Sequence, residues 1–65
     1  MKVSEGIAIL KADGWVQVRQ KGAHRQFRHG TKPGTVTVAG KLSGDLKKGT
    51  WASIQRQAGL KGSRQ

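Results

Sequence analysis

Residues 15–29, WVQVRQKGAHRQFRH, decide the fold. The first part alternates, which predicts a strand with Val16 and Val18 facing the core and mainly polar side chains on the other face. Lys21-Gly22 predicts a two-residue hairpin turn, because glycine readily adopts the positive φ that such turns require. The chain then returns as a second strand, AHRQFRH. The whole stretch therefore predicts an antiparallel hairpin.

The second strand is expected to have one buried face and one open face. Phe27 is its single large apolar side chain and should face the core. A period of two residues puts the polar side chains on the opposite face: His24, Gln26 and Arg28. On the first strand, Gln17 and Arg19 are assigned to this same face. The hairpin therefore predicts a polar, basic sheet surface that is open to ligands.

A helix is predicted before the hairpin, over residues 3–12. Its apolar residues recur at helical spacing, at Val3, Ile7 and Leu10. Ser4 is a candidate N-cap, Glu5 suits the first turn, and Asp13-Gly14 is a typical stop signal. Trp15, at the junction of helix and strand, is expected to close one end of the core rather than to stack on a base.

A third strand is predicted after the hairpin, over residues 35–39. Pro33-Gly34 suits a type II turn before it, and Val36 and Val38 should face the core. Residues 40–48, GKLSGDLKK, are too rich in Gly and Lys for a regular element. We expect this long loop to be held to the core by Leu42 and Leu46.

A second helix is predicted over residues 50–58, with Thr50 as its N-cap. Its apolar face carries Trp51, Ile54 and Ala58. Gly59 should end it, with Leu60 packing back, and the tail KGSRQ at 61–65 should be frayed. The sequence thus predicts one α+β domain of 65 residues, with its core at 3–60. Its order is α-β-β-β-α, a three-stranded antiparallel sheet with both helices packed on one face in two layers.

The charge of the chain favours a polyanionic partner. Thirteen Lys and Arg face three Asp and Glu, giving +10. This exceeds the net charge of about 2–8 that serves solubility in a small domain. Nucleic acid is the leading candidate, and an anionic membrane surface or an acidic protein are the alternatives. No apolar run approaches the roughly 20 residues of a membrane-spanning helix. The absence of cysteine fits the cytoplasm.

Several kinds of catalytic or metal site find no support in the sequence. Glu5, Asp13 and Asp45 are far apart, and two of them lie at predicted helix ends. With two histidines and no cysteine, neither zinc nor a two-metal nuclease site is expected. Phosphate-loop and G-x-S-x-G motifs are also absent. No metal or cofactor is therefore predicted.

His24 is the one candidate for proton transfer. An imidazole exchanges a proton near neutral pH, and RNA carries its own nucleophile, the 2′-hydroxyl. Lys21, Arg25 or Arg28 would stabilise the charge that develops on the phosphate. The residue types alone leave a simple phosphate or solvent contact as the alternative. His29 falls on the Phe27 side and is expected to be a hydrogen-bonded structural histidine.

Lysines outside the hairpin are candidate phosphate contacts. Lys47 and Lys48 precede the second helix, whose first N–H groups are free to bind an anion. The alternative is a solvated basic loop. Trp51 lies on the apolar helix face and is expected to be core.

Three segments resemble the HicA-type (YcfA-like) toxins of bacterial toxin–antitoxin systems. They are DGWVQVRQKGAHRQFRH, KPGTVTV and LKKGTWASIQRQAGL, and the resemblance covers residues 3–60. It implies a fold similar to the double-stranded-RNA-binding domain and a metal-independent ribonuclease that cleaves mRNA and arrests translation. The family's essential histidine aligns with His24. A HicB-type antitoxin that covers the site is the implied partner.

The sequence departs from the family pattern at two places. The family motif G-S-H-H-x-F is G-A-H-R-Q-F here, with Ala23 and Arg25 in place of Ser and His. After the third strand, V-A-G-K replaces V-P-x-H, and Lys41 and Arg25 are the candidate substitutes as phosphate contacts. These departures keep open a second hypothesis, a non-catalytic RNA-binding module of the same fold. A regulatory partner of an acidic protein is a third.

Overall fold

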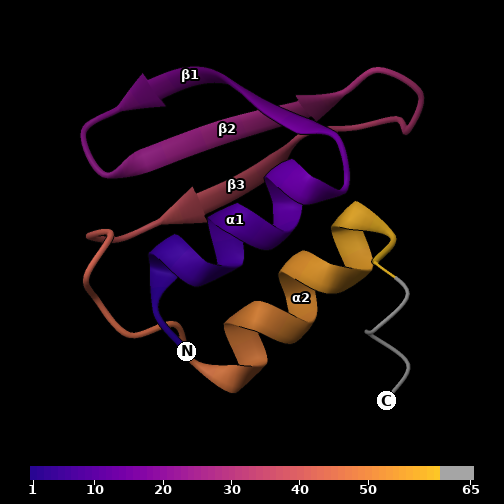
Figure 1. The fold of residues 1–65 in the computed structure, drawn as a ribbon. Helices are drawn as coiled ribbons and strands as arrows, with labels where there is room; N and C mark the ends of the chain where they lie inside the picture. Colours follow the sequence, from indigo (N-terminus) through magenta and orange to yellow (C-terminus); the bar gives the residue numbers. More distant parts are fainter. Residues whose placement is uncertain (61–65) are drawn as a thin grey trace.

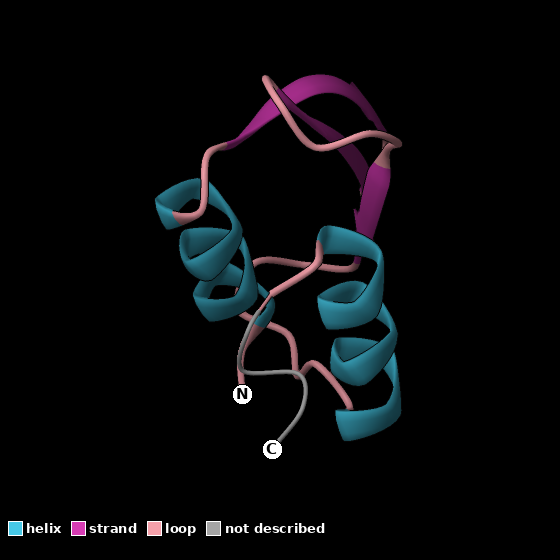
Figure 2. Ribbon diagram, turned by 90° about the vertical axis from the view of Figure 1, so that its right-hand side faces the viewer, coloured by secondary structure: helices cyan, strands magenta, loops and turns pink. Residues whose placement is uncertain are grey.

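The computed structural model describes residues 1–60 and confirms the predicted order of elements. The elements are α1 (Val3–Ala12), β1 (Trp15–Lys21), β2 (His24–His29), β3 (Val36–Ala39) and α2 (Lys48–Ala58) (Figure 1). The three strands form one antiparallel sheet in the order β1-β2-β3. Both helices lie on the same side of this sheet, as Figure 2 shows. The predicted frayed tail at 61–65 lies outside the described residues.

The core fills the space between the sheet and the two helices. As predicted, Trp15 and Phe27 are fully buried in it. The other buried apolar residues are Val3, Ile7, Leu10, Val36, Val38, Leu46, Ile54, Ala58 and Leu60. The other face of the sheet carries neither helix and is therefore open to a ligand.

Trp51 is half-buried and packs against the edge of this core. A β-carbon on Gly6 would lie 2.9 Å from Leu46 Cδ2 and 3.1 Å from Trp51 Cζ3. The glycine in α1 therefore makes room for the indole of α2. Trp51 thus belongs to the hydrophobic packing as predicted, but at its margin.

The strand pairing of β1, which includes a β-bulge, corrects the predicted faces of this strand. Gln17 pairs with Phe27, but the next partner of β2, Gln26, pairs with Arg19. Val18 is therefore the extra residue of β1. The predicted core positions Val16 and Val18 are 62% and 56% exposed. Val16 pairs with Arg28 and so lies on the open face, whereas Val18 is exposed as the extra residue of the bulge, which sets two residues of one strand against one of its partner.

Gln17, which precedes the bulge, also lies on a different face from the predicted one. Because it pairs with Phe27, Gln17 lies on the helix side of the sheet and not on the open face that we predicted. Its side-chain amide donates to Gln20 Oε1 at 3.2 Å. The hairpin turn is also one residue later than predicted. Lys21 still pairs with His24, and Gly22-Ala23 forms the turn, with Gly22 at φ 59°.

Both helices begin earlier than their expected caps indicated. Lys2, not Ser4, is the N-cap of α1, and its N–H donates to Glu5 Oε1 at 2.6 Å. The first N–H groups of α1 donate to carbonyls of the 40–47 loop: Val3 to Gly44 at 2.9 Å and Ser4 to Leu42 at 3.0 Å. These backbone partners replace the side-chain cap. Similarly, α2 has Lys47 as its N-cap, so Thr50 lies inside the helix.

The 40–47 loop is held to the core by one of the two predicted leucines. Leu46 is buried, and its N–H donates to the Met1 carbonyl at 2.7 Å. Leu42 is 51% exposed and anchors the loop through its carbonyl instead. At the end of α2 the prediction is confirmed: Gly59 is left-handed, and the N–H of buried Leu60 donates to Gln55 O at 3.0 Å.

Candidate functional site

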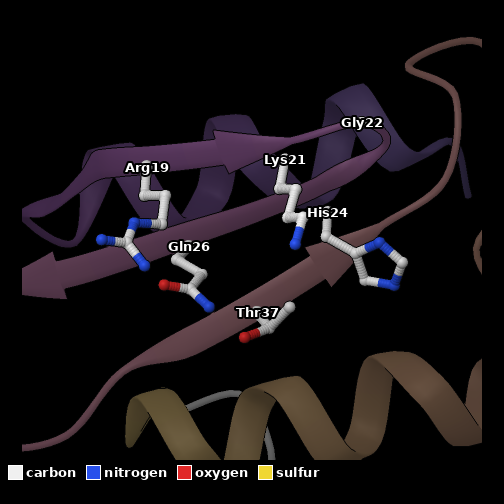
Figure 3. Close-up of a pocket in the computed structure, with 6 residues that line it drawn as sticks. All are labelled: Arg19, Lys21, Gly22, His24, Gln26 and Thr37. Carbon is white, nitrogen blue, oxygen red and sulfur yellow. The ribbon is translucent and has the colours of Figure 1, made fainter.

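The open face of the sheet holds a surface pocket of about 500 Å³. All three strands and the hairpin turn contribute to it. Its lining residues, shown in Figure 3, are Arg19, Lys21, Gly22, His24, Gln26 and Thr37. No carboxylate is among them, and two side chains are cationic. The pocket is therefore suited to an anionic ligand.

Strand pairing arranges these side chains in two rows across the sheet. In the first row, Arg19 pairs with Gln26, and Gln26 pairs with Thr37. In the second row, Lys21 pairs with His24, and His24 pairs with Ala39. Residues directly opposite each other have β-carbons about 4.5–5.5 Å apart and lie on one face. His24 is thus next to a lysine, in the last row of the sheet, where β1 and β3 end and β2 begins.

The bulge at Val18 gives the pocket its two cations. Trp15 faces the helices, and strict alternation from Trp15 would put every odd-numbered residue of β1 on that side. One extra residue reverses the faces after Gln17, so that Arg19 and Lys21 reach the open face. The prediction that Arg19 lies on the open face is correct, but the bulge is the reason.

His24 is exposed and free to act on a ligand. No hydrogen bond or ion pair to its imidazole occurs within residues 1–60. Figure 3 shows the ring extending outward from the start of β2, at the hairpin end of the sheet where Lys21 also lies. Gln26, in the other row, directs its amide towards Thr37. Thr37 was not among the predicted site residues, although the alternation of β3 between buried Val36 and Val38 puts it on the open face.

Arg25 is not part of this face, which corrects its expected place beside His24 as a phosphate contact. Its exposure is 8%, because β2 alternation directs it to the helix side. Its NH1 group donates to Gly40 O at 2.7 Å and to Ala23 O at 3.4 Å. Arg28 does lie on the open face, opposite Val16, but outside the pocket.

The three predicted lysine contacts are exposed but do not line the pocket. Lys41 follows Gly40 after the end of β3. Lys47 and Lys48 lie at the beginning of α2, as the N-cap and first residue of that helix. The structure therefore groups Arg19, Lys21, Gln26 and His24, and leaves these lysines as separate surface charges.

His29 is a structural histidine, as predicted. Its Nε2 lies 2.7 Å from Asp13 O, and its Nδ1 accepts the N–H groups of Thr31 and Lys32 at 3.0 and 3.1 Å. The proton is therefore on Nε2, which donates to the carbonyl. The ring also makes an edge contact with the Trp15 indole, with 5.2 Å between the two ring centroids. With both nitrogens engaged, His29 is not available to a ligand.

Asp13 is a structural carboxylate. It accepts hydrogen bonds from Lys32 Nζ at 2.6 Å and from Trp15 Nε1 at 3.2 Å. The hydrogen bond from Lys32 is the main reason that the pKa of Asp13 is lowered from its usual value of 3.8. Lys32 Nζ also donates to the Ala58 carbonyl at 3.0 Å. This ammonium therefore joins the C-terminal ends of both helices.

Neither a metal cluster nor a membrane span is found in the described part of the chain. No group of three or more His, Cys, Asp or Glu side chains gathers within residues 1–60. No helix in the same range is long and apolar enough to cross a membrane.

The fold and its pocket define a small, basic α+β domain with an exposed histidine beside cations. The family described as HicA toxin of bacterial toxin–antitoxin matches residues 3–60. The chain therefore belongs to the HicA toxin family. It is also similar to a solved chain of a toxin–antitoxin complex from Streptococcus pneumoniae, with 34% identity and a TM-score of 0.74. That match covers 92% of this chain and 98% of the other. None of the curated proteins compared with the chain matches it.

Proposed function

We propose that the protein is the toxin of a type II toxin–antitoxin system and an endoribonuclease that cleaves mRNA, with His24 as its general acid or base. The observation that carries the proposal is the pairing of His24 with Lys21 in a cationic pocket. Membership of the HicA toxin family supports the toxin class. Translation arrest in the cytoplasm would follow from loss of mRNA.

The chemistry needs few groups from the protein. The imidazole of His24 takes the proton of the 2′-hydroxyl, and the 2′-oxygen attacks the adjacent phosphorus. The bond from phosphorus to the 5′-oxygen then breaks, and that oxygen takes up a proton from the imidazolium or from water. The products are a 2′,3′-cyclic phosphate and a 5′-hydroxyl. General acid–base catalysis of this kind contributes typically about 10²–10⁴-fold.

The cations supply charge stabilisation and binding. Lys21, opposite His24, is placed to stabilise the negative charge of the phosphorane. Arg19, in the neighbouring row, would hold an adjacent phosphate, with Gln26 beside it to contact sugar or base. The exposed cations outside the pocket are assigned to further phosphates along the strand: Arg28, Lys41, Lys47 and Lys48. Arg25 is left out because it is buried.

The partner proposed for control is a HicB-type antitoxin. The solved relative comes from a toxin–antitoxin complex, which supports a protein partner for this chain. The open sheet face is the surface where such a partner would block RNA. Antitoxin and RNA should therefore compete for binding.

A binding-only module remains the second candidate function, and one observation favours it. His24 is the single candidate general acid or base among the side chains that line the pocket. One imidazole supplies one proton-transfer group, so the other transfer depends on solvent or on reuse of the same ring. If one imidazole is insufficient for cleavage, the protein binds single-stranded RNA without cleaving it.

The test is cleavage of a single-stranded mRNA by purified protein in EDTA, with the His24→Ala variant beside it. Circular dichroism should first establish that the variant is folded. We expect fragments with 5′-hydroxyl ends from the wild type and none from the variant. Equal cleavage by both would assign the activity to another residue or to a contaminant. Binding without cleavage by either would establish the second candidate.

A further inference from the structure

We infer that Arg25 is a positioning residue for His24, which deepens and rests on the proposed function. Arg25 is the one buried polar or charged side chain within residues 1–60. Burial of a guanidinium is costly unless its charge is paired or its donors are satisfied. No carboxylate pairs with Arg25 in this part of the chain. Only its hydrogen bonds to backbone carbonyls therefore offset the cost of burying this charge.

The partners of Arg25 are the backbone groups that flank the His24 row. Ala23 immediately precedes His24, and Gly40 immediately follows Ala39, the partner of His24 on β3. The guanidinium donates to both of their carbonyls, at 3.4 Å and 2.7 Å. The Gly40 N–H also donates to Ala23 O at 3.1 Å. Together these bonds form a clamp that closes the end of the β2–β3 ladder.

His24 needs such a clamp because nothing holds its ring. A general base is usually oriented by a hydrogen bond from a third group. No such bond reaches the imidazole within residues 1–60. His24 also lies in the last row of the sheet, where strand ends fray. The position of the ring is therefore set by its backbone, and Arg25 fixes that backbone from the opposite face.

The Arg25→Met variant tests this role, because it keeps an apolar stem and loses both guanidinium hydrogen bonds of the clamp. We expect kcat for RNA cleavage to fall about 10- to 100-fold, the effect of a small misplacement of a catalytic group. KM and the salt dependence of RNA binding should stay within about twofold, since no phosphate contact is lost. Arg25→Lys, which keeps a donor for Gly40 O, should restore part of kcat.

A core variant of matched thermal stability, Ile54→Val, controls for mere destabilisation. The Ile54→Val variant should keep the wild-type kcat per folded molecule. Amide hydrogen exchange gives a second readout that is independent of activity: in Arg25→Met, exchange of the Gly40 N–H should speed up at least about tenfold more than in Ile54→Val. Unchanged Gly40 exchange would overturn the clamp, and faster exchange with unchanged kcat would overturn the positioning role.

Two further outcomes are decisive. Weaker RNA binding with a shallower salt dependence in Arg25→Met would make Arg25 a phosphate contact and refute the inference. If wild-type protein binds RNA but cleaves none, the proposed nuclease function fails and no positioning role for catalysis survives. In that case, hydrogen exchange of the Gly40 N–H in Arg25→Met still decides whether the clamp exists.

Discussion

Trp15 and Arg19 lie on opposite faces of the same strand, although they are four residues apart. Trp15 is buried under the helices, and Arg19 lines the pocket on the open face. An even spacing would put both side chains on one face of a regular strand. The bulge at Val18 separates them, so one strand serves both the core and the candidate site.

Two single-residue deletions in β1 should therefore differ in their effect on RNA binding. Deleting Val18 removes the bulge but keeps Arg19 opposite Gln26. Deleting Gln20 gives a chain of the same length as the Val18 deletion. Without Gln20, β1 can pair with β2 regularly from Gln17 to Lys21, and this pairing turns Arg19 to the helix side. Loss of one phosphate contact should reduce the slope of log K against log salt by about 0.7. We expect this in the Gln20 deletion and not in the Val18 deletion.

Fluorescence anisotropy with a single-stranded RNA, at several salt concentrations, measures both slopes. Circular dichroism should show that both deletion variants are folded. Equal slopes for the two variants would mean either that the bulge does not place Arg19 or that Arg19 binds no phosphate.

Replacing Lys21 by Met should lower the rate of cleavage more than the affinity for RNA. Lys21 is opposite His24, where charge develops in the transition state. Removing one such stabilising donor costs about 10²–10³-fold in kcat in other enzymes, and an exposed lysine should lie at the lower end. Single-turnover cleavage with saturating protein measures this step. Arg28→Met removes the same charge from the same sheet face outside the pocket and should act mainly on binding. Similar loss of kcat in both variants would remove the special role of Lys21.

The sequence contained enough to predict the fold but not the bulge. Periodicity identified Phe27, Val36 and Val38 as core residues, because each lies in a regular strand under the helices. It failed for Val16 because regular pairing directs Trp15 to the core and Val16, opposite Arg28, to the open face. It failed for Val18 because one extra residue in a strand leaves no mark on an alternating pattern. The predicted N-caps Ser4 and Thr50 were wrong, although α1 begins at Val3 as predicted. At α1, carbonyls of a loop distant in sequence replace the expected Ser4 cap.

Strand alternation also predicted part of the candidate site. His24 and Gln26 followed from the alternation of β2. The same alternation assigns Arg25 to the buried face, but positive charge beside His24 indicated an RNA contact instead. The burial of a guanidinium against two backbone carbonyls is a tertiary arrangement that no local pattern indicates.

Gly14→Ala should destabilise the fold through both backbone and packing. Gly14 has φ 103°, a conformation that residues with a β-carbon rarely adopt. A β-carbon there would also lie 2.7 Å from His29 Nε2, which donates to the neighbouring Asp13 carbonyl. We expect a loss of more than about 1 kcal/mol in the free energy of unfolding, measured by urea denaturation. Gly30→Ala is the control, because a β-carbon at Gly30 meets nothing within 4 Å. Equal stability of the two variants would contradict both the backbone strain at Gly14 and the contact with His29.

The Asp13–Lys32 pair should make stability depend on acid pH. The hydrogen bond from Lys32 lowers the pKa of Asp13 in the folded state below its usual 3.8. The unfolded chain therefore binds this proton at higher pH than the folded protein does. The stabilisation is fully present above the unfolded pKa and is lost as pH falls through the folded pKa. Asp13→Asn should thus be less stable than the wild type above about pH 5, and the difference should shrink below about pH 4.

Thermal unfolding from pH 2 to 7 measures this difference in free energy. Asp45→Asn serves as the control, because the Asp45 carboxylate is 81% exposed and lies 3.6 Å from the terminal amine. Exposed ion pairs of this kind contribute little, so the control should follow the wild-type curve closely. A constant gap between Asp13→Asn and the wild type across the whole range would mean that the Lys32 bond does not favour the charged carboxylate. Lys32 would then act only through its bonds to the α2 carbonyls.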